Sequence, residues 1–151
     1  MPRILAVDWG ERRIGLAVSD DLGILATGLP TLEIRGEAEA VARVADTIRT
    51  VEADSVVVGL PLTLKGERGE AARAVERFAD ALRREVPVAV SLFDERLTSK
   101  MAERRMHERG ERLGTRTRRG AGKGRVDQGA AVALLEGWLA KLRIEREGDA
   151  T

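Results

Sequence analysis

Residue types that often carry chemistry are absent or nearly absent from this sequence, which has no cysteine, no tyrosine and one histidine, His107. Without cysteine there is no disulfide, no thiolate metal site and no cysteine nucleophile. The lack of tyrosine excludes a covalent phosphotyrosine intermediate. One histidine cannot build a multi-histidine metal site, and we expect His107 on an exposed helix face. Catalysis, if there is any, must depend on carboxylates and on a hard metal ion bound through oxygen.

Long hydrophobic runs and aromatic residues are also scarce. The longest apolar stretch, residues 56–62, is far too short to cross a bilayer, and the N-terminal residues lack the layout of a signal peptide. We therefore expect a soluble, cytoplasmic protein without a membrane partner. Aromatic residues make up 3% of the chain, which is too few for a base-stacking platform of the RRM or OB type.

The chain is long enough for one ordinary domain, because 43% of its 151 residues are hydrophobic. We expect this domain over residues 1–145 and a disordered tail over 146–151. The net charge of +1 hides an uneven distribution, since residues 100–125 hold ten Lys or Arg and three acids. This local excess of positive charge predicts a polyanionic partner such as nucleic acid.

The hydrophobic pattern predicts an α/β protein. Three strands are expected over 3–8, 14–19 and 23–34, with Pro30 near the end of the third strand or in a bulge. Their short polar links indicate an antiparallel meander. Helices are expected over 36–53 and 67–85, and strands over 55–59 and 87–95. Further helices are expected from 98 to about 112 and over 126–144, with a mobile basic loop over 114–125 between them.

This order predicts the fold class. The later strands alternate with helices, so they should be parallel and joined by right-handed crossovers. We expect a mixed five-stranded sheet, made of a three-strand antiparallel meander and two parallel strands, with helices on both faces. The inner face of the first helix should carry Ala38, Val41, Ala42, Ala45 and Ile48. That of the second helix should carry Ala71, Ala74, Val75, Phe78, Ala81 and Leu82.

Acidic residues stand at strand ends and on one apolar helix face. Asp8 ends the first strand, and Asp94 and Glu95 end the last. Ligand sites form beyond the carboxyl ends of parallel strands. Asp127 lies three and four residues before Ala130 and Ala131, on the apolar stripe of the last helix. Such carboxylates could together bind one or two divalent cations for phosphodiester hydrolysis.

Each acid also has a purely structural interpretation. Asp8 could be a turn residue at a strand end, Glu95 could form an ion pair with Arg96, and Asp127 could cap its helix. We favour the shared site because the chain offers no other chemistry. Gly10 would let phosphate or a metal ion approach the backbone closely. Trp9 could stack on a base, but core packing is the better interpretation, and we place Trp138 in the core as well.

Four segments in order along the chain carry a resemblance: DWGERRIGLAVSD, VVVGLPLTLKGERGEAA, FDERLTS and KGRVDQGAAVALL. They resemble the motif blocks of the YqgF/RuvX family of Holliday junction resolvases, which have an RNase H-like fold. The resemblance implies that Asp8, Glu95 and Asp127 are catalytic metal-binding acids, with Mg²⁺ or Mn²⁺ as cofactor. It also implies a nuclease that processes the 5′ end of pre-16S ribosomal RNA or cuts branched DNA. Gly129 departs from the pattern and predicts a looser helix start near Asp127.

Basic residues near these acids are candidates for binding substrate phosphate. Arg12 and Arg13 lie in the link after Asp8, where they could equally be exposed turn residues, and Arg96 follows Glu95. The basic segment would contact backbone phosphates without distinguishing sequence. Its candidate residues are Arg116, Arg118, Arg119, Lys123 and Arg125.

Three functional classes stay open from the sequence. The first is a divalent-metal-dependent nuclease acting on ribosomal RNA precursor or on a Holliday junction. A junction resolvase needs two active sites and hence a homodimer, and the sequence leaves the oligomeric state open. The second is an actin-like nucleotide-binding domain, which shares the Asp-x-Gly hairpin but needs a second similar domain. The third is a nucleic-acid-binding module for ribosome assembly without catalytic activity.

Overall fold

A computed structural model describes residues 2–63, 65–94 and 119–150, and within the last segment the side chains of 129–148. The elements follow the order that the sequence predicts. They are β1 (Ile4–Asp8), β2 (Arg13–Ser19), β3 (Ala26–Glu33), α1 (Glu37–Val51), β4 (Ser55–Leu60), α2 (Glu70–Glu85), β5 (Ala89–Asp94) and α5 (Arg119–Ala150).

The five strands form one mixed sheet in the order β3-β2-β1-β4-β5. β2 pairs antiparallel with both β1 and β3, whereas β4 pairs parallel with both β1 and β5. The expected meander plus two parallel strands is therefore confirmed. Because β1 is central, Val7 is paired on both sides, with Leu16 of β2 and Val58 of β4. Asp8, which ends the strand, is paired with Gly15 of β2.

Pro30 lies at an irregularity of the edge strand β3. Ile14 pairs with Leu32 and Leu16 pairs with Leu29, so two residues of β3, Pro30 and Thr31, lie opposite Gly15 alone. A proline has no N–H to give to a ladder and is tolerated at edges and bulges. The expectation that Pro30 sits in a bulge is confirmed.

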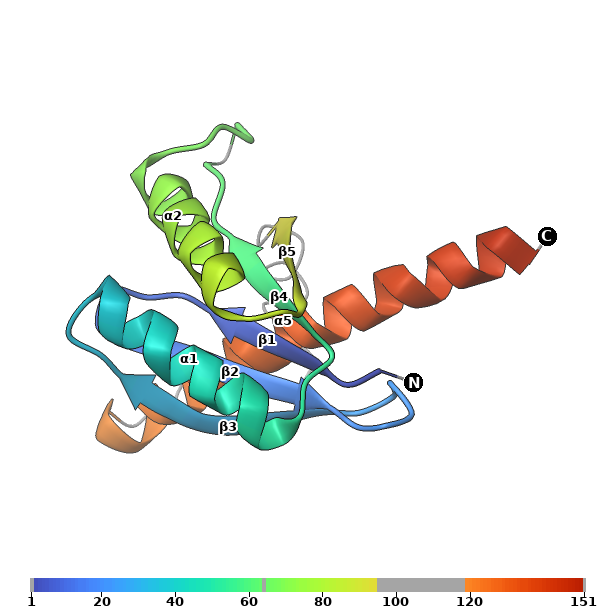
Figure 1. Cartoon of the computed structure of the whole chain (residues 1–151), viewed down its shortest axis with the longest axis horizontal. Helices are drawn as coiled ribbons and strands as arrows, with labels where there is room; N and C mark the ends of the chain where they lie inside the picture. Colours follow the sequence, from blue (N-terminus) through green and yellow to red (C-terminus); the bar gives the residue numbers. More distant parts are fainter. Residues whose placement is uncertain (1, 64, 95–118, 151) are drawn as a thin grey trace.

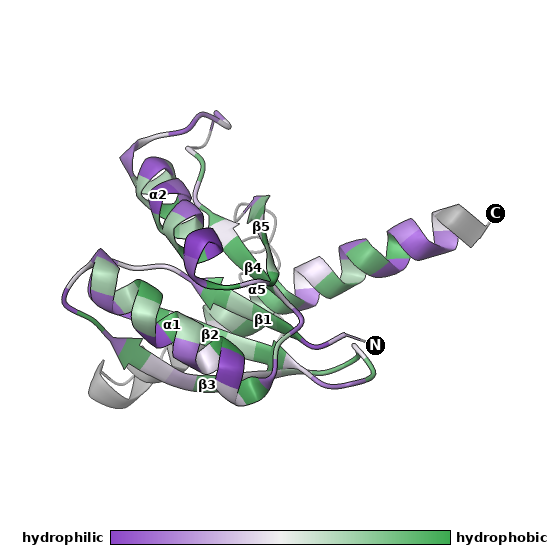
Figure 2. Cartoon of the chain, viewed as in Figure 1, coloured by the Kyte–Doolittle hydropathy of each residue, from purple (hydrophilic) through white to green (hydrophobic). Residues whose placement is uncertain are grey.

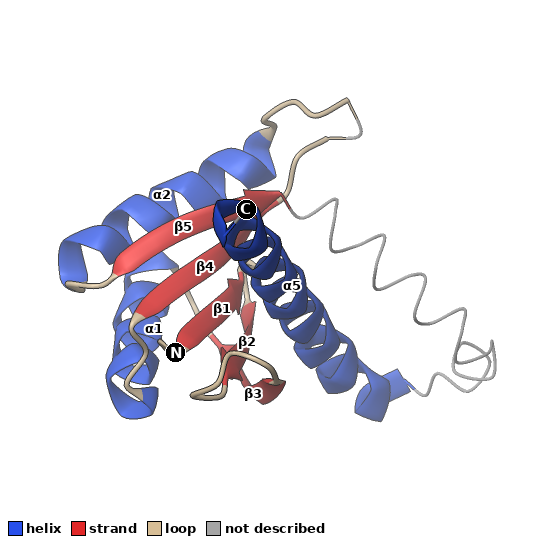
Figure 3. Ribbon diagram, turned by 90° about the vertical axis from the view of Figure 1, so that its right-hand side faces the viewer, coloured by secondary structure: helices blue, strands red, loops and turns tan. Residues whose placement is uncertain are grey.

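Helices cover both faces of the sheet (Figures 1 and 3): α1 and α2 lie on one face and α5 on the other. Alternation along β1 divides the core accordingly. Leu5 and Val7 pack in the cluster with α1 and α2, and Ile4 and Ala6 pack in the cluster with α5. In Figure 2 the strands are mostly hydrophobic, whereas α1 and α2 alternate between hydrophobic and hydrophilic residues.

The buried faces of α1 and α2 differ in part from the expected ones. Ala38, Ala42 and Ala71 are exposed. The side chains buried instead are Ala40 and Val44 in α1 and Ala72 and Ala79 in α2. Burying valine removes more apolar area from water than burying alanine, so α1 is turned to bury Val41, Val44 and Ile48 together.

Helix α5 is longer than the sequence predicts at both ends. It begins at Arg119, so the expectation of a loop is wrong for residues 119–125, and it continues over 146–150, where we expected a disordered tail. Extending a helix costs little once packed turns have formed, and the turns from Ala131 to Leu139 pack on the sheet. The predicted helix from 98 to 112 lies outside the described residues.

Gly129 lies inside this helix rather than near its start. It is exposed, and a side chain placed there would meet nothing within 4 Å. In the segments that the structure describes, no helix is both long enough and apolar enough to cross a membrane.

Candidate functional site

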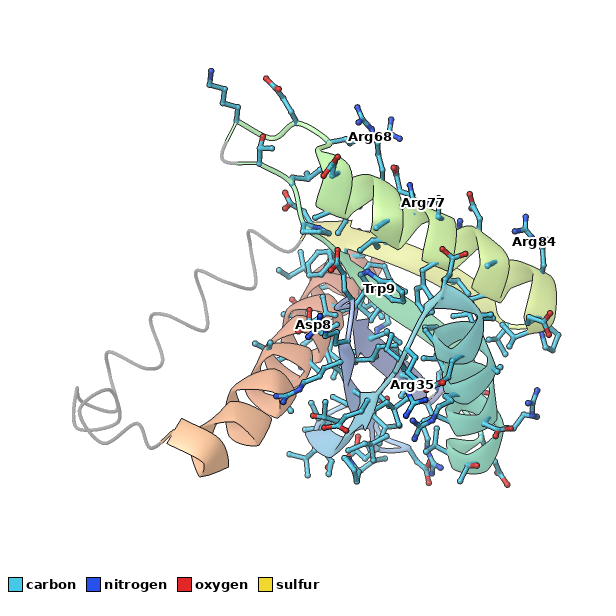
Figure 4. The ribbon with its side chains drawn as sticks, turned by 90° about the vertical axis from the view of Figure 1, so that its left-hand side faces the viewer. Asp8, Trp9, Arg35, Arg68, Arg77 and Arg84 are labelled. Atoms are coloured by element: carbon cyan, nitrogen blue, oxygen red, sulfur yellow. The ribbon has the colours of Figure 1, made fainter. Side chains whose placement is uncertain are left out.

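Asp8 ends the central strand on the side of the sheet that α5 covers. Ile4 and Ala6 pack against α5, and alternation places Asp8 on the same side. Trp9, the next residue, packs with the opposite cluster. Figure 4 looks onto this edge of the sheet, with Asp8 beside α5 and Trp9 turned toward α2. The strand therefore holds the carboxylate at a set position and direction.

Trp9 anchors the chain directly after Asp8. Its ring lies 4.7 Å from that of Phe78 in α2, at an interplanar angle of 31°. Phe78 is fully buried. This confirms core packing for Trp9. Trp138 of α5 likewise packs in the core, where its ring makes an edge contact with Phe93 at 5.4 Å.

A hollow of about 430 Å³ opens beside Asp8. Its walls come from the end of β1, the tight link to β2 and the first residues of β2. Arg12 and Arg13, both predicted to bind substrate, belong to this wall. The hollow is large enough for a phosphate group and a cation. Its walls carry two acids, Asp8 and Glu11, and the two arginines, which offers carboxylate oxygens to a cation and guanidinium groups to a phosphate.

Gly10 is required by the link itself. A Cβ at this position would lie 2.5 Å from the carbonyl oxygen of Arg13. We expected this glycine to admit phosphate or a metal ion. The structure supplies an internal reason, since the link can turn this tightly only without a side chain at Gly10.

Asp94, at the end of β5, does not join Asp8. Phe93 packs on the α5 side and is followed by Asp94, which alternation turns to the α1 and α2 side. Of the other predicted site residues, Glu95, Arg96, Arg116 and Arg118 lie outside the described residues.

The remaining predicted site residues belong to α5. Asp127 precedes Ala131 by four residues, and Ala131 is fully buried in the cluster with Ala6. The N-terminal end of α5 lies on the side of the sheet at which β1 ends (Figure 1). The side chains of Asp127, Arg119, Lys123 and Arg125 lie outside what the structure describes. Within the described part, no three His, Asp or Glu side chains are grouped so as to hold a metal ion.

A second hollow, of about 940 Å³, adjoins the first and was not predicted. It shares Arg12 and Arg13 with the hollow of Asp8 and adds Arg35 and Arg43. The backbone N–H of Ile34 donates to the carbonyl of Arg12 at 2.9 Å, which holds the end of β3 against the β1–β2 link. No local pattern marks Arg35, because its place depends on this contact between distant segments.

Comparison with known proteins agrees with this geometry. The family described as "RuvX: Holliday junction resolvase" matches residues 2–141. A relative from Nocardia farcinica is 46% identical over 144 residues, covering 91% of this chain and 77% of its own. One from Anaeromyxobacter dehalogenans is 44% identical over 137 residues, covering 91% of this chain and 96% of its own. Both carry the name "Putative pre-16S rRNA nuclease".

Solved structures share the fold. RuvC from T. thermophilus, in complex with a Holliday junction substrate, has a TM-score of 0.57 at 18% identity, covering 94% of this chain and 96% of its own. A Fowlpox virus resolvase has a TM-score of 0.53 at 11% identity, covering 93% and 98%. These similarities identify the sheet and its helices as an RNase H-like fold.

Proposed function

This chain belongs to the RuvX family of Holliday junction resolvases and is a hydrolase of the nuclease class, and we propose that it processes the 5′ end of pre-16S ribosomal RNA. The observation that carries the proposal is the placement of Asp8 at the end of the central strand, facing α5 and lining a hollow whose walls also include Arg12 and Arg13. The names of the curated relatives supply the substrate. This substrate implies a cytoplasmic location.

We assign Asp8, Glu95 and Asp127 as the catalytic acids that bind Mg²⁺ or Mn²⁺. Asp8 fits this role because its carboxylate is rigidly mounted next to space for an ion and a phosphate. Glu95 is chosen over Asp94 because Asp94 lies on the other face. Asp127 is chosen because it comes one helical turn before the packed Ala131. A few carboxylates together with substrate phosphate are the ligands that Mg²⁺ prefers.

The reaction adds one water across a phosphodiester bond, leaving a phosphate on one product and a hydroxyl on the other. A divalent cation, when bound, supplies positive charge that stabilises the charge developing on the phosphate oxygens. Asp8 is paired with Gly15 of β2 and directly follows Val7, which is paired with both neighbouring strands, so little reorganisation is needed during the reaction. We assign phosphate binding to the basic side chains of the domain over 1–145. These are Arg12, Arg13, Arg96, Arg116, Arg118, Arg119, Lys123 and Arg125.

The proposal is tested by comparing Asp8→Asn with Asp20→Asn, an identical change at another strand-end aspartate. Labelled RNA spanning the 5′ end of pre-16S ribosomal RNA is incubated with each protein in Mg²⁺, Mn²⁺ or EDTA. We expect the parent protein and Asp20→Asn to cut only with metal, and Asp8→Asn to be slower by at least about a thousandfold. Mn²⁺ should raise the melting temperature of the parent protein and not that of Asp8→Asn.

Two results would contradict this proposal. Binding of RNA without cutting, unchanged in Asp8→Asn, would identify a non-catalytic module for ribosome assembly. Cutting that survives Asp8→Asn would remove Asp8 from the site. Glu95→Gln and Asp127→Asn, tested in the same way, would show whether all three acids act together.

Holliday junction resolution is the second candidate, favoured by the description of the matching family. A labelled four-way DNA junction, run beside the RNA, separates the two activities. Resolution by paired cuts needs two active sites, so it predicts a homodimer by light scattering. Cutting of RNA alone by a monomer would exclude it.

A further inference from the structure

The hollow next to that of Asp8 has the features of a binding surface that continues from the site. We call it the arginine hollow, after Arg12, Arg13, Arg35 and Arg43 in its walls. Its volume of about 940 Å³ exceeds the roughly 430 Å³ of the hollow at Asp8. The two hollows share the wall formed by Glu11, Arg12 and Arg13. A chain bound at Asp8 can therefore continue into the arginine hollow.

The four arginines differ in the hydrogen bonds and ion pairs that their side chains form within the protein. Arg43 donates to the carbonyl of Glu33 at 2.7 Å and lies 3.9 Å from the carboxylate of Glu39. Arg13 is half-buried and has partners of its own. Arg12 and Arg35 are exposed and form no ion pair with any other residue in the described segments. These two guanidinium groups can bind a ligand without breaking an existing ion pair.

The backbone holds Arg12 and Arg35 on neighbouring segments. The carbonyl of Arg12 accepts the N–H of Ile34, and Ile34 is buried and directly precedes Arg35. Both arginines therefore extend from fixed positions at the end of the sheet where β1 ends. Figure 4 views this end, with Asp8 beside α5 and Arg35 beside α1. Guanidinium groups bind phosphate through two parallel hydrogen bonds, which makes arginine suited to a phosphate backbone.

Glutamates also line the arginine hollow and limit where a polyanion can lie. Glu39 is turned to Arg43, whereas Glu11 and Glu33 are exposed. Phosphates would be repelled from Glu33 and attracted to Arg12 and Arg35, so a strand would follow the two arginines. This mixture of charges predicts that the loss of a glutamate and the loss of an arginine have opposite effects on binding.

We propose that the arginine hollow is the path by which one strand of the nucleic acid substrate leaves Asp8, with Arg12 and Arg35 binding phosphates on the α1 side. The proposal rests on the proposed nuclease function and deepens it, because it assigns a direction to the bound strand. It also adds Arg35 as a substrate-binding residue far in sequence from the basic segment 100–125.

The test measures binding in EDTA, so that no cutting intervenes, by anisotropy of a labelled single-stranded RNA over a range of salt concentrations. We expect Arg35→Gln to weaken binding by about tenfold and to reduce the slope of log Kd against log salt by about 0.7. Arg12→Gln should behave alike. Glu33→Gln should strengthen binding by about threefold. The matched control is Arg77→Gln, an exposed arginine of α2 outside the hollow, which should leave binding unchanged.

Separate results distinguish this proposal from the nuclease function. If the parent protein cuts RNA but Arg35→Gln, Arg12→Gln and Arg77→Gln all bind like it, the path is wrong and the nuclease function stands. If the parent protein never cuts but the arginine and glutamate variants shift binding in opposite directions, the path stands and the nuclease function fails. The absence of RNA and junction binding by the parent protein would overturn the path in favour of a protein partner. Melting temperatures of all variants check that each is folded.

Discussion

Two links at opposite ends of β2 both begin with an aspartate. Asp8 ends β1 and starts the link to β2, and Asp20 follows β2 and starts the link to β3. Each is followed within three residues by a glycine, Gly10 or Gly23. In sequence the two links share an aspartate followed by a glycine, yet the structure gives their carboxylates different surroundings.

Asp20 is used within its own turn. Its carboxylate accepts the backbone N–H of Ile24 at 2.8 Å and that of Leu25 at 3.3 Å. The hydrogen bond from Ile24 is the main reason that the pKa of Asp20 lies below its ordinary value. Asp8 instead lines a hollow beside two arginines. The carboxylate of Asp20 thus stabilises its own turn, whereas that of Asp8 lines the hollow.

The links also differ in how they are fixed. The first is anchored to the core by Trp9, whose ring packs on Phe78. The second exposes its large apolar side chains, Leu22, Ile24 and Leu25. A link that must position a reacting group needs rigid support from the core, whereas a plain turn does not.

Trp9→Ala should give the largest change in stability among tests of this difference. It removes the ring contact with Phe78 and should lower the free energy of unfolding by about 3 kcal/mol. Leu22→Ala, at a side chain 67% exposed, should change it by less than about 0.5 kcal/mol. Urea unfolding of both variants measures this. Equal losses would show that the two links are fixed alike.

Gly10→Ala should affect both stability and cutting. The new Cβ would meet the carbonyl oxygen of Arg13 at 2.5 Å, so the backbone beside Asp8 must shift. We expect a loss of about 2 kcal/mol in stability and a drop of at least about tenfold in the cutting rate of the folded variant. Unfolding and cleavage are measured on the same preparation. An unchanged cutting rate would show that the link does not position Asp8.

Gly23→Ala is the matched change in the second link. Gly23 has a φ of 69°, in the left-handed region that disfavours alanine. We expect a loss of about 1 kcal/mol in stability with no change in cutting. Thermal unfolding and the cleavage assay measure the two effects. A fall in the cutting rate as large as that expected for Gly10→Ala would show that the second link matters for cutting as much as the first.

Asp20→Asn should give the smallest effect, visible as a change in acid stability. Because the folded pKa is lowered, the ionised carboxylate stabilises the fold above the pKa of the unfolded chain, and this is lost as pH falls through the folded pKa. The variant should therefore lose less stability than the parent protein between neutral pH and about pH 3. Parallel melting curves against pH would contradict this. Carbon NMR of the Asp20 carboxyl gives its pKa directly.

Some features of the molecule follow from local sequence. Hydrophobic residues that recur about every two positions predicted the strands β1 to β5, and those that recur about every 3.6 positions predicted the helices α1 and α2. Both sets were predicted in the right order. The bulge at Pro30 also followed, because proline lacks the N–H that a regular ladder needs. Asp8 could be identified as a candidate site residue because it is the one charged residue at the end of an otherwise apolar strand. These predictions succeeded because each depends on residues close together in the chain.

Local sequence was a poor guide where helix packing decided the outcome. Three glycines within residues 119–125 favoured a loop in the sequence. In the structure these residues are the first turns of a helix that begins at Arg119, and the later turns, from Ala131 onward, pack on the sheet. The face of α1 shifted to Val44 because alanines at several positions made alternative faces nearly equal in the sequence.

The sequence by itself determined the order of strands and helices, the family, and a short set of acids that could react. Only the tertiary structure decided that Asp8 lines a hollow while Asp20 is bonded within its turn, that Asp94 lies on the other face, and that Arg35 lines the hollow that adjoins that of Asp8. The physical reason is that these outcomes depend on strand register, side-chain alternation and contacts such as that of Ile34 with Arg12. Such contacts join segments that no local pattern connects.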